Sequence, residues 1–140
     1  PLQKLHQNFV ISANAFVQWA GIAALKEADA DVARMKSLYN DRRKFIIRRL
    51  RELGFGITVE PTGAFYVLAN AKRYTQNSFD LAFDILRKAK VGCTPGIDFG
   101  SNAEGYLRFS YANSIENIHE AMNRLEAYLQ ENFWAREKKP

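Results

Sequence analysis

The stretch Tyr106-Leu107-Arg108-Phe109-Ser110-Tyr111 decides the fold, because its side chains alternate as in a β-strand with two unlike faces. One face is apolar and is expected to lie under helices: Leu107, Phe109 and Tyr111. The other face is expected to border a cleft or solvent: Tyr106, Arg108 and Ser110. A guanidinium on a rigid strand suits a small carboxylate, because its planar fork matches two carboxylate oxygens at once. A surface ion pair is the alternative role for Arg108.

Around this strand the sequence predicts alternating helices and short strands. Helical spacing of apolar residues predicts four helices, over residues 8–28, 31–53, 78–90 and 114–129. Ser12 or Asn14 is expected to cap the first helix, and Gly54 to end the second. Ser78 and Ser114 are the expected caps of the other two. Strands are predicted at 56–60, 64–69, 91–94 and 106–111.

This order of elements predicts an α+β fold, a small sheet of about four strands with helices on one face. The 140 residues fit one domain spanning residues 1–140. No apolar run approaches the roughly 20 residues that cross a bilayer, so no membrane association is expected. The start of the sequence does not resemble a signal peptide, which makes a cytoplasmic location the default expectation. Cys93, the single cysteine, fits a reducing compartment, and no metal site is expected.

The net charge of +5 comes largely from one predicted helix. That helix carries Arg42, Arg43, Lys44, Arg48, Arg49 and Arg51. A basic run of this kind can bind nucleic acid, but the commoner interpretation is a solvated helix face. A binding partner made of nucleic acid is therefore not expected.

A second segment of interest is Pro61-Thr62-Gly63-Ala64-Phe65-Tyr66. Gly63 permits a tight turn and a close backbone approach to a ligand. Phe65 is a candidate pocket residue, and Tyr66 is expected to point to the opposite face. Two alternatives stay open: the aromatic residues pack the sheet, or the strand belongs to an RNA-recognition module.

Taken together, the motifs resemble the C-terminal part of the class I and II pyridoxal-phosphate aminotransferases. The likeness begins at Gln7-Asn8-Phe9-Val10-Ile11-Ser12 and includes Pro61-x-Gly63-Ala64-Phe65-Tyr66. It continues through Pro95-Gly96-x-x-Phe99-Gly100 and closes with residues 105–112 and the Arg124-Leu125 pair. The order and spacing of these motifs are more specific than any one of them.

The resemblance implies a parent enzyme that moves an amino group between an amino acid and a 2-oxo acid with pyridoxal 5'-phosphate. It implies that Arg108 binds the substrate α-carboxylate, that Phe65 borders the active site, and that Ser12 and Asn14 lie near a homodimer contact. The family's Schiff-base lysine belongs to an upstream large domain. No lysine of this sequence has the expected context. We therefore expect a piece of a longer enzyme, the small domain, with no catalytic residue of its own, no bound cofactor and no activity alone.

Two further hypotheses remain. The chain is either a free-standing module that binds nucleic acid or protein without catalysis, or a non-catalytic interaction domain with an aminotransferase shape. The sequence does not select the amino-acid substrate.

Overall fold

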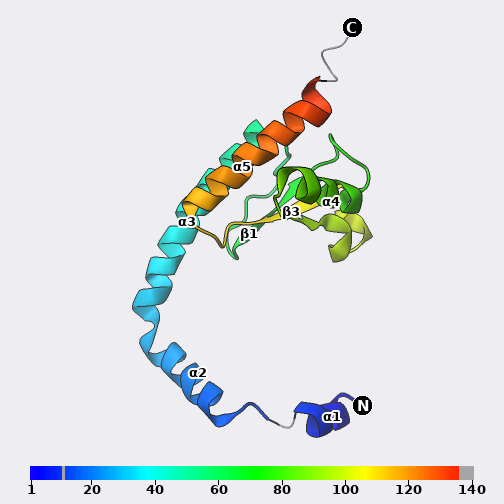
Figure 1. Ribbon diagram of the computed structural model, residues 1–140. Helices are drawn as coiled ribbons and strands as arrows, with labels where there is room; N and C mark the ends of the chain where they lie inside the picture. Colours follow the sequence, from blue (N-terminus) through cyan, green and yellow to red (C-terminus); the bar gives the residue numbers. More distant parts are fainter. Residues whose placement is uncertain (11, 136–140) are drawn as a thin grey trace. The chain divides into compact units, whose positions relative to one another are not determined.

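The computed structural model describes residues 1–10 and 12–135, and the chain divides into two compact units, Pro1–Leu38 and Tyr39–Pro140. Figure 1 shows the elements of both units. The helices are α1 (Leu2–Leu5), η1 (His6–Val10), α2 (Ala15–Glu27), α3 (Asp29–Glu52), α4 (Ser78–Ala89), η2 (Gly96–Phe99), η3 (Ser101–Ala103), α5 (Ile115–Leu129) and η4 (Gln130–Trp134). The strands are β1 (Tyr66–Asn70), β2 (Thr94–Pro95) and β3 (Tyr106–Ser110).

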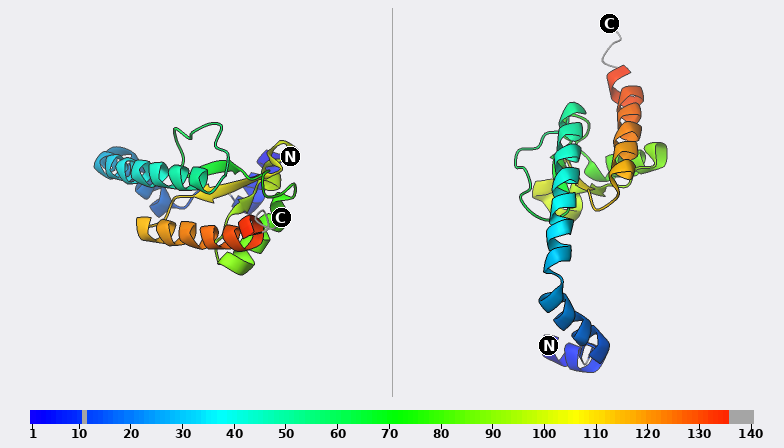
Figure 2. Two further views of the ribbon diagram at one scale, coloured as in Figure 1. Left: turned by 90° about the horizontal axis from the view of Figure 1, so that it is seen from above. Right: turned by 90° about the vertical axis from the view of Figure 1, so that its left-hand side faces the viewer.

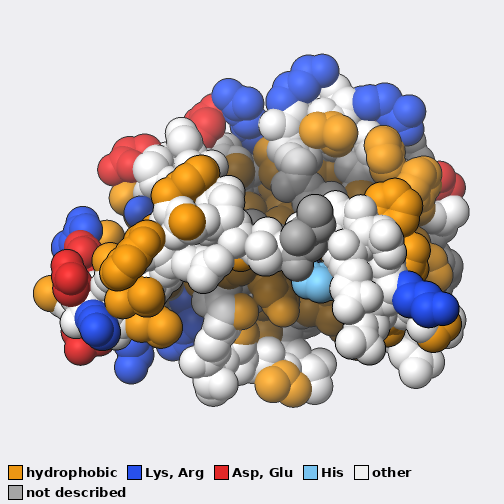
Figure 3. All heavy atoms as spheres, turned by 90° about the horizontal axis from the view of Figure 1, so that it is seen from below, with side chains coloured by type: hydrophobic (Ala, Val, Ile, Leu, Met, Phe, Trp, Pro, Cys, Tyr) orange, Lys and Arg blue, Asp and Glu red, His pale blue; other side chains and the backbone are white. Residues whose placement is uncertain are grey.

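The first unit is helical and has no interior of its own. The prediction of one helix over residues 8–28 is wrong, because the short α1 and η1 precede α2. Asn14 caps α2, as one of the two predicted caps, with its Oδ1 accepting a hydrogen bond from the Val17 N–H at 3.0 Å. None of the residues described between 1 and 38 is buried, and Phe9 and Leu25 are more than four-fifths exposed. Hydrophobic side chains are correspondingly visible on the surface in Figure 3.

The second unit is built on a three-stranded antiparallel sheet in the order β1-β3-β2. Leu68 of β1 and Thr94 of β2 both lie opposite Arg108 of β3. The sheet has three strands where about four were expected, because the predicted strand over residues 56–60 is wrong. Only Gly56 pairs, in an isolated bridge with Asn70. Val59 beyond it is 79% exposed, so no buried face favours further pairing.

Burial along β3 confirms the alternation predicted from the sequence. Leu107 and Phe109 are buried, as is Tyr111 just beyond the strand, while Arg108 is only partly buried. Three helical segments cover the buried face: α4, α5 and the part of α3 after residue 38. The helices α3 and α5 lie side by side (Figures 1 and 2). An ion pair of 2.7 Å between Arg49 and Glu126 joins them.

The structure revises several predicted element ends. The helix α3 begins at Asp29, before the predicted cap Asp31, because the Val32 N–H already donates to the Ala28 carbonyl. Gly54 ends this helix as predicted, with a left-handed φ of +83°. Ser114 caps α5 as predicted. The cap of α4 is Asn77 and not Ser78, because the Asn77 side chain accepts the Asp80 N–H and Ser78 is buried.

The third predicted strand is also displaced along the chain. It was expected over residues 91–94, but β2 consists of Thr94 and Pro95 only. Proline has no N–H to donate, which limits how far this strand pairs. Among the described residues, no single helix is long and apolar enough to span a membrane, although the bent pair Leu2–Val10 and Ala15–Glu27 reaches that length and composition together.

Candidate functional site

Arg108 lies on the central strand of the sheet, on the face that the helices leave uncovered. Its neighbours across the sheet are Leu68 and Thr94. The Arg108 Nη2 donates to the Thr94 Oγ1 at 3.4 Å, which is long for a hydrogen bond. This contact leaves the Nε–H and Nη1–H groups of the guanidinium without a hydrogen-bond partner among the described residues.

Two aromatic rings lie against the Arg108 guanidinium. The Cζ atom is 5.0 Å from the centroid of the Tyr66 ring and 4.8 Å from that of the Phe99 ring. Tyr66 comes from β1, and Phe99 ends the short helix η2. Both distances are within the range of a cation–π interaction. We refer to Arg108, Tyr66, Phe99 and Thr94 together as the Arg108 site.

The guanidinium of Arg108 is not neutralised by the part of the chain that the structure describes. No carboxylate of the described residues lies within ion-pair distance of it, so the surface ion pair considered above finds no partner there. Several arginines of α3 differ in this respect. Glu60 pairs with Arg43 and Arg51, and Glu126 pairs with Arg49. This pairing favours the interpretation of the basic run as an ordinary charged helix face over a nucleic-acid site.

Of the two aromatic residues singled out from the sequence, Tyr66 is the one whose ring contacts the Arg108 guanidinium. Tyr66 faces Arg108, whereas Phe65 lies just before β1 and is 47% exposed. The two rings meet edge to face, with centroids 5.5 Å apart. The Phe65 ring therefore contacts the Tyr66 ring, which in turn contacts the guanidinium. The Phe65 carbonyl accepts the Tyr111 N–H at 2.8 Å and so holds the end of β1 to the end of β3.

The loop that carries Phe99 is held against the beginning of α4. We call residues 96–105 the Phe99 loop. The Glu104 Oε1 accepts the Ser78 N–H at 2.6 Å and the Gly105 N–H at 2.8 Å. The Ser78 Oγ in turn accepts the Ile97 N–H at 3.2 Å. These backbone donors, first that of Ser78, lower the pKa of Glu104 below its ordinary value, so the carboxylate stays charged at neutral pH.

Close backbone packing also shapes the Phe99 loop. A Cβ atom on Gly96 would lie 1.9 Å from the Ala103 carbonyl oxygen and 2.7 Å from that of Tyr106. Only glycine fits such an approach. The sequence drew attention to Pro95-Gly96 as a turn, but it gave no sign that Phe99 and Thr94 belong to the Arg108 site or that Glu104 holds the Phe99 loop. The position of a loop residue in the sequence does not reveal which residues of the sheet its side chain contacts.

The other predicted positions are not part of this arrangement. Ser12 and Asn14 belong to the first unit, where Asn14 caps α2 and Ser12 is exposed. Burial raises the pKa of the Cys93 thiol to about 12, so it remains protonated at neutral pH and is a poor nucleophile. Among residues 1–10 and 12–135, no cluster of histidine, cysteine and acidic side chains could hold a metal ion.

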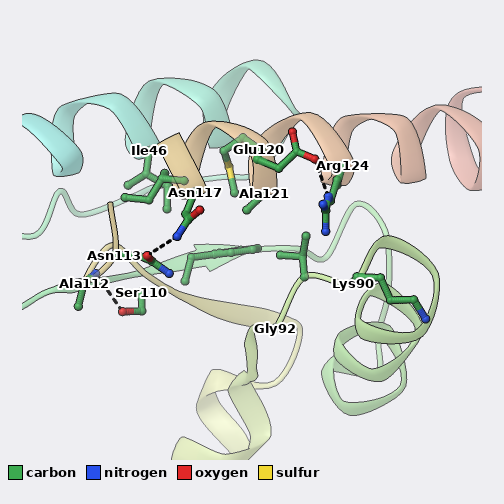
Figure 4. Close-up of a pocket in the computed structure, with 14 residues that line it drawn as sticks. Ile46, Lys90, Gly92, Ser110, Ala112, Asn113, Asn117, Glu120, Ala121 and Arg124 are labelled. Atoms are coloured by element: carbon green, nitrogen blue, oxygen red, sulfur yellow. Dashed lines mark hydrogen bonds and ion pairs between the residues drawn. The ribbon is translucent and has the colours of Figure 1, made fainter. Parts of the chain in front are cut away.

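A separate cavity of about 390 Å³ lies between α5, the end of β3 and residues 90–92 (Figure 4). Arg108 does not line it. Two pairs of its polar side chains bond each other: Arg124 donates to Glu120 at 2.7 Å, and the Asn117 Nδ2 donates to the Asn113 Oδ1 at 2.9 Å. Arg124 therefore has a carboxylate partner in this cavity, whereas the described residues give Arg108 none.

Comparison with known proteins gives consistent matches. A family model for aminotransferases of class I and II matches residues 2–125. An aspartate aminotransferase from Pyrococcus horikoshii is 43% identical over 132 residues, which cover 92% of this chain and 34% of that protein. The crystal structure of Pyrococcus protein A1 superposes with a TM-score of 0.84 at 36% identity, over 91% of this chain and 33% of that one. An aromatic aminotransferase from P. horikoshii gives a TM-score of 0.77 at 38% identity, over 83% and 31%. The chain thus spans about a third of the length of these relatives.

Proposed function

Because the chain belongs to the class I and II aminotransferase family, we propose that it is the C-terminal small domain of an enzyme that transfers an amino group between an amino acid and a 2-oxo acid. Its coverage of about a third of its relatives supports the placement as one domain of a larger polypeptide. The upstream large domain is then its first partner. The single observation that carries the functional part of the proposal is the guanidinium of Arg108, which contacts two aromatic rings and has no carboxylate partner among the described residues.

In this proposal Arg108 binds the substrate α-carboxylate. The guanidinium is a planar fork of five N–H groups, and the Nη2 contact with Thr94 leaves enough of them to form two parallel hydrogen bonds to the oxygens of a carboxylate. Amino-acid and 2-oxo-acid substrates share this carboxylate, so one arginine serves both halves of the reaction. Phe65 borders the same site beside Tyr66 and is proposed to shield the bound substrate from water.

The family generally depends on pyridoxal phosphate, but the residues at the Arg108 site fit a carboxylate and not the cofactor. The side chains that contact Arg108 are those of Thr94, Tyr66 and Phe99, and none carries an amine that could join the cofactor. We propose that the cofactor's lysine and phosphate contacts lie in the upstream large domain, and that this chain alone is inactive. When bound, the cofactor withdraws electrons from the substrate Cα and so acidifies its proton.

The contribution of this domain is then orientation of the substrate. A carboxylate fixed by two hydrogen bonds on a rigid strand fixes the direction of the neighbouring Cα–H bond. Because β3 is the central strand, its backbone is held on both sides by β1 and β2. The backbone position of Arg108 is therefore well fixed, which suits a side chain that has to orient a substrate.

The first unit supports the proposed assembly. Its apolar side chains are exposed throughout the described residues, which is typical of a surface that packs against further protein. We propose that the upstream large domain and a second subunit of a homodimer cover it, with Ser12 and Asn14 near the subunit contact. A cytoplasmic location is part of the same proposal.

The test uses the full polypeptide of which this chain is a part. A panel of amino acids, with 2-oxoglutarate as the acceptor, first identifies the best substrate. We expect Arg108→Ala to lower kcat/KM for that substrate about tenfold to a hundredfold, mainly through KM, while the absorbance of the bound cofactor persists. Arg48→Ala, at an exposed position of α3, is the control and is expected to leave the kinetics unchanged. Unchanged kinetics in Arg108→Ala would remove this residue from the active site.

A further inference from the structure

The orientation of the Arg108 guanidinium depends on neighbouring side chains that do not themselves bind the substrate. An arginine side chain on an exposed sheet face is free to adopt many rotamers, and binding a carboxylate requires one of them. Ion pairs hold several arginines of α3, such as Arg49 with Glu126, but the described residues give Arg108 no such partner. Its fixed contacts are the long hydrogen bond to Thr94 and the rings of Tyr66 and Phe99.

The two rings differ in how they are held. Tyr66 is the first residue of β1, so the sheet itself fixes its position opposite Ser110. Phe99 comes from the Phe99 loop, and its ring is 50% exposed. The ring therefore reaches the guanidinium only when the loop has the conformation seen here. Glu104 stabilises that conformation by accepting the N–H groups of Ser78 and Gly105.

We propose that Phe99 is a positioning residue, which holds the Arg108 guanidinium with its free N–H groups open to the substrate, and that the Glu104 contact with α4 keeps Phe99 in place. This inference rests on the proposed carboxylate-binding role of Arg108. It adds that carboxylate affinity depends on an aromatic ring that itself touches neither cofactor nor reacting atoms. The ring acts by restricting the guanidinium before the substrate arrives, which lowers the entropic cost of binding.

A role through Arg108 predicts a specific kinetic pattern. Loss of the ring weakens the binding of any ligand that uses the carboxylate contact, so KM rises for both the amino acid and the 2-oxo acid. The rate at saturating substrate changes little, because a bound carboxylate restores the orientation of the guanidinium. A ligand that lacks a carboxylate is not affected. A general loss of structure would instead lower kcat as well and would weaken the binding of ligands with and without a carboxylate.

The experiment compares Phe99→Leu with Phe99→Tyr in the full-length enzyme, with Arg108→Ala measured in parallel. We expect Phe99→Leu to raise both KM values about threefold to tenfold with kcat within twofold, as the loss of one cation–π contact implies. Phe99→Tyr keeps an aromatic ring and is expected to remain within twofold of the unaltered enzyme. The inhibition constant of 3-phenylpropionate, a carboxylate without an amine, is expected to rise in parallel with KM in Phe99→Leu, and that of 3-phenylpropan-1-ol to stay constant.

The outcomes separate this inference from the proposed function. If Arg108→Ala weakens substrate binding while Phe99→Leu leaves KM within twofold, the positioning role is overturned and the carboxylate-binding role stands. If Phe99→Leu and Phe99→Tyr raise KM equally, the ring is not the cause and the inference is also overturned. If Arg108→Ala has no effect, both are overturned. Because Phe99 is half exposed, the unfolding temperature of each variant serves as the check that the fold is intact.

Discussion

The ring of Phe99 lies 4.8 Å from the Cζ atom of Arg108, although residues 100–107, including the short helix η3, separate them in the sequence. The contact brings a loop residue back over the central strand of the sheet. The loop that achieves this depends on a glycine at its start and on a carboxylate near its end. Each of these features leads to a measurable prediction.

Gly96 is predicted to be intolerant of a side chain. In Gly96→Ala the new Cβ would meet the carbonyl oxygens of Ala103 and Tyr106, and backbone atoms cannot move aside as a side chain can. We expect a loss of about 1–3 kcal/mol in the free energy of unfolding, measured by chemical denaturation. Gly92→Ala is the matched control, because no atom lies within 4 Å of its added Cβ. Equal stability of the two variants would contradict the packing described here.

The Glu104 carboxylate is predicted to order the Phe99 loop. In Glu104→Ala the N–H groups of Ser78 and Gly105 lose their common acceptor. We expect faster amide hydrogen exchange at residues 97–105, with exchange in β1 and β3 unchanged. In Glu104→Gln the amide oxygen can still accept both bonds, and exchange is expected to rise less. Unaltered protection in Glu104→Ala would show that the loop is held by other contacts.

The contact between α4 and α5 is predicted to depend on pH. The Tyr128 hydroxyl donates to the Asp84 Oδ2 at 2.6 Å, and Lys88 donates to the same oxygen at 2.9 Å. Tyr128 first, and then Lys88, lower the pKa of Asp84 below its ordinary value of 3.8. Stability from this carboxylate is therefore present above pH 3.8 and is lost as the pH falls through the lowered pKa.

The measurement is the free energy of unfolding of Tyr128→Phe against pH. We expect a loss of about 1–2 kcal/mol at pH 7, since a hydrogen bond to a charged group is removed. The difference from the unaltered chain is expected to narrow below pH 3.8. Tyr39→Phe is the control, because the Tyr39 hydroxyl makes no hydrogen bond with the described residues. A difference that stays constant down to low pH would argue against a charged acceptor.

The two compact units are predicted to differ in autonomous stability. Residues 39–140 contain the hydrophobic core, whereas the described residues up to Leu38 include no buried side chain. We expect a chain starting at Tyr39 to keep its cooperative thermal unfolding, and a peptide of residues 1–38 to show little helix by circular dichroism. Binding of a dye for exposed apolar surface is expected to fall when residues 1–38 are removed. A cooperative fold of the peptide alone would contradict this division.

The sequence predicted the parts of the fold that follow from local patterns. The alternation around Arg108, the end of α3 at Gly54 and the cap at Ser114 depend on neighbouring residues, and the structure has all three. The prediction of a strand over residues 56–60 is wrong, because a strand also needs a neighbouring strand to pair with, and the local spacing of residues does not reveal whether one is present. The cap of α4 moved to Asn77, because Ser78 is drawn into the buried contact with the Phe99 loop.

At the candidate site, too, the sequence predicted what depends on local pattern and missed what depends on contacts between distant residues. Arg108 stands out in a strand of otherwise uncharged residues, so the sequence identified it. The partners of Arg108 come from β1, β2 and η2, which the fold brings together from distant positions. The sequence singled out Phe65 as a candidate pocket residue, whereas the ring of β1 that contacts the Arg108 guanidinium is that of Tyr66. Strand alternation places alternate side chains on opposite faces, but β1 begins only at Tyr66, so Phe65 precedes the regular pattern.

The most direct test of the central proposal is a crystal structure of the full-length enzyme with its amino-acid substrate or 3-phenylpropionate bound. The proposal predicts two hydrogen bonds of about 2.7–2.9 Å from Arg108 to the ligand carboxylate, with the guanidinium still between Tyr66 and Phe99. A carboxylate held by a different cation, with Arg108 directed away from the ligand, would contradict it.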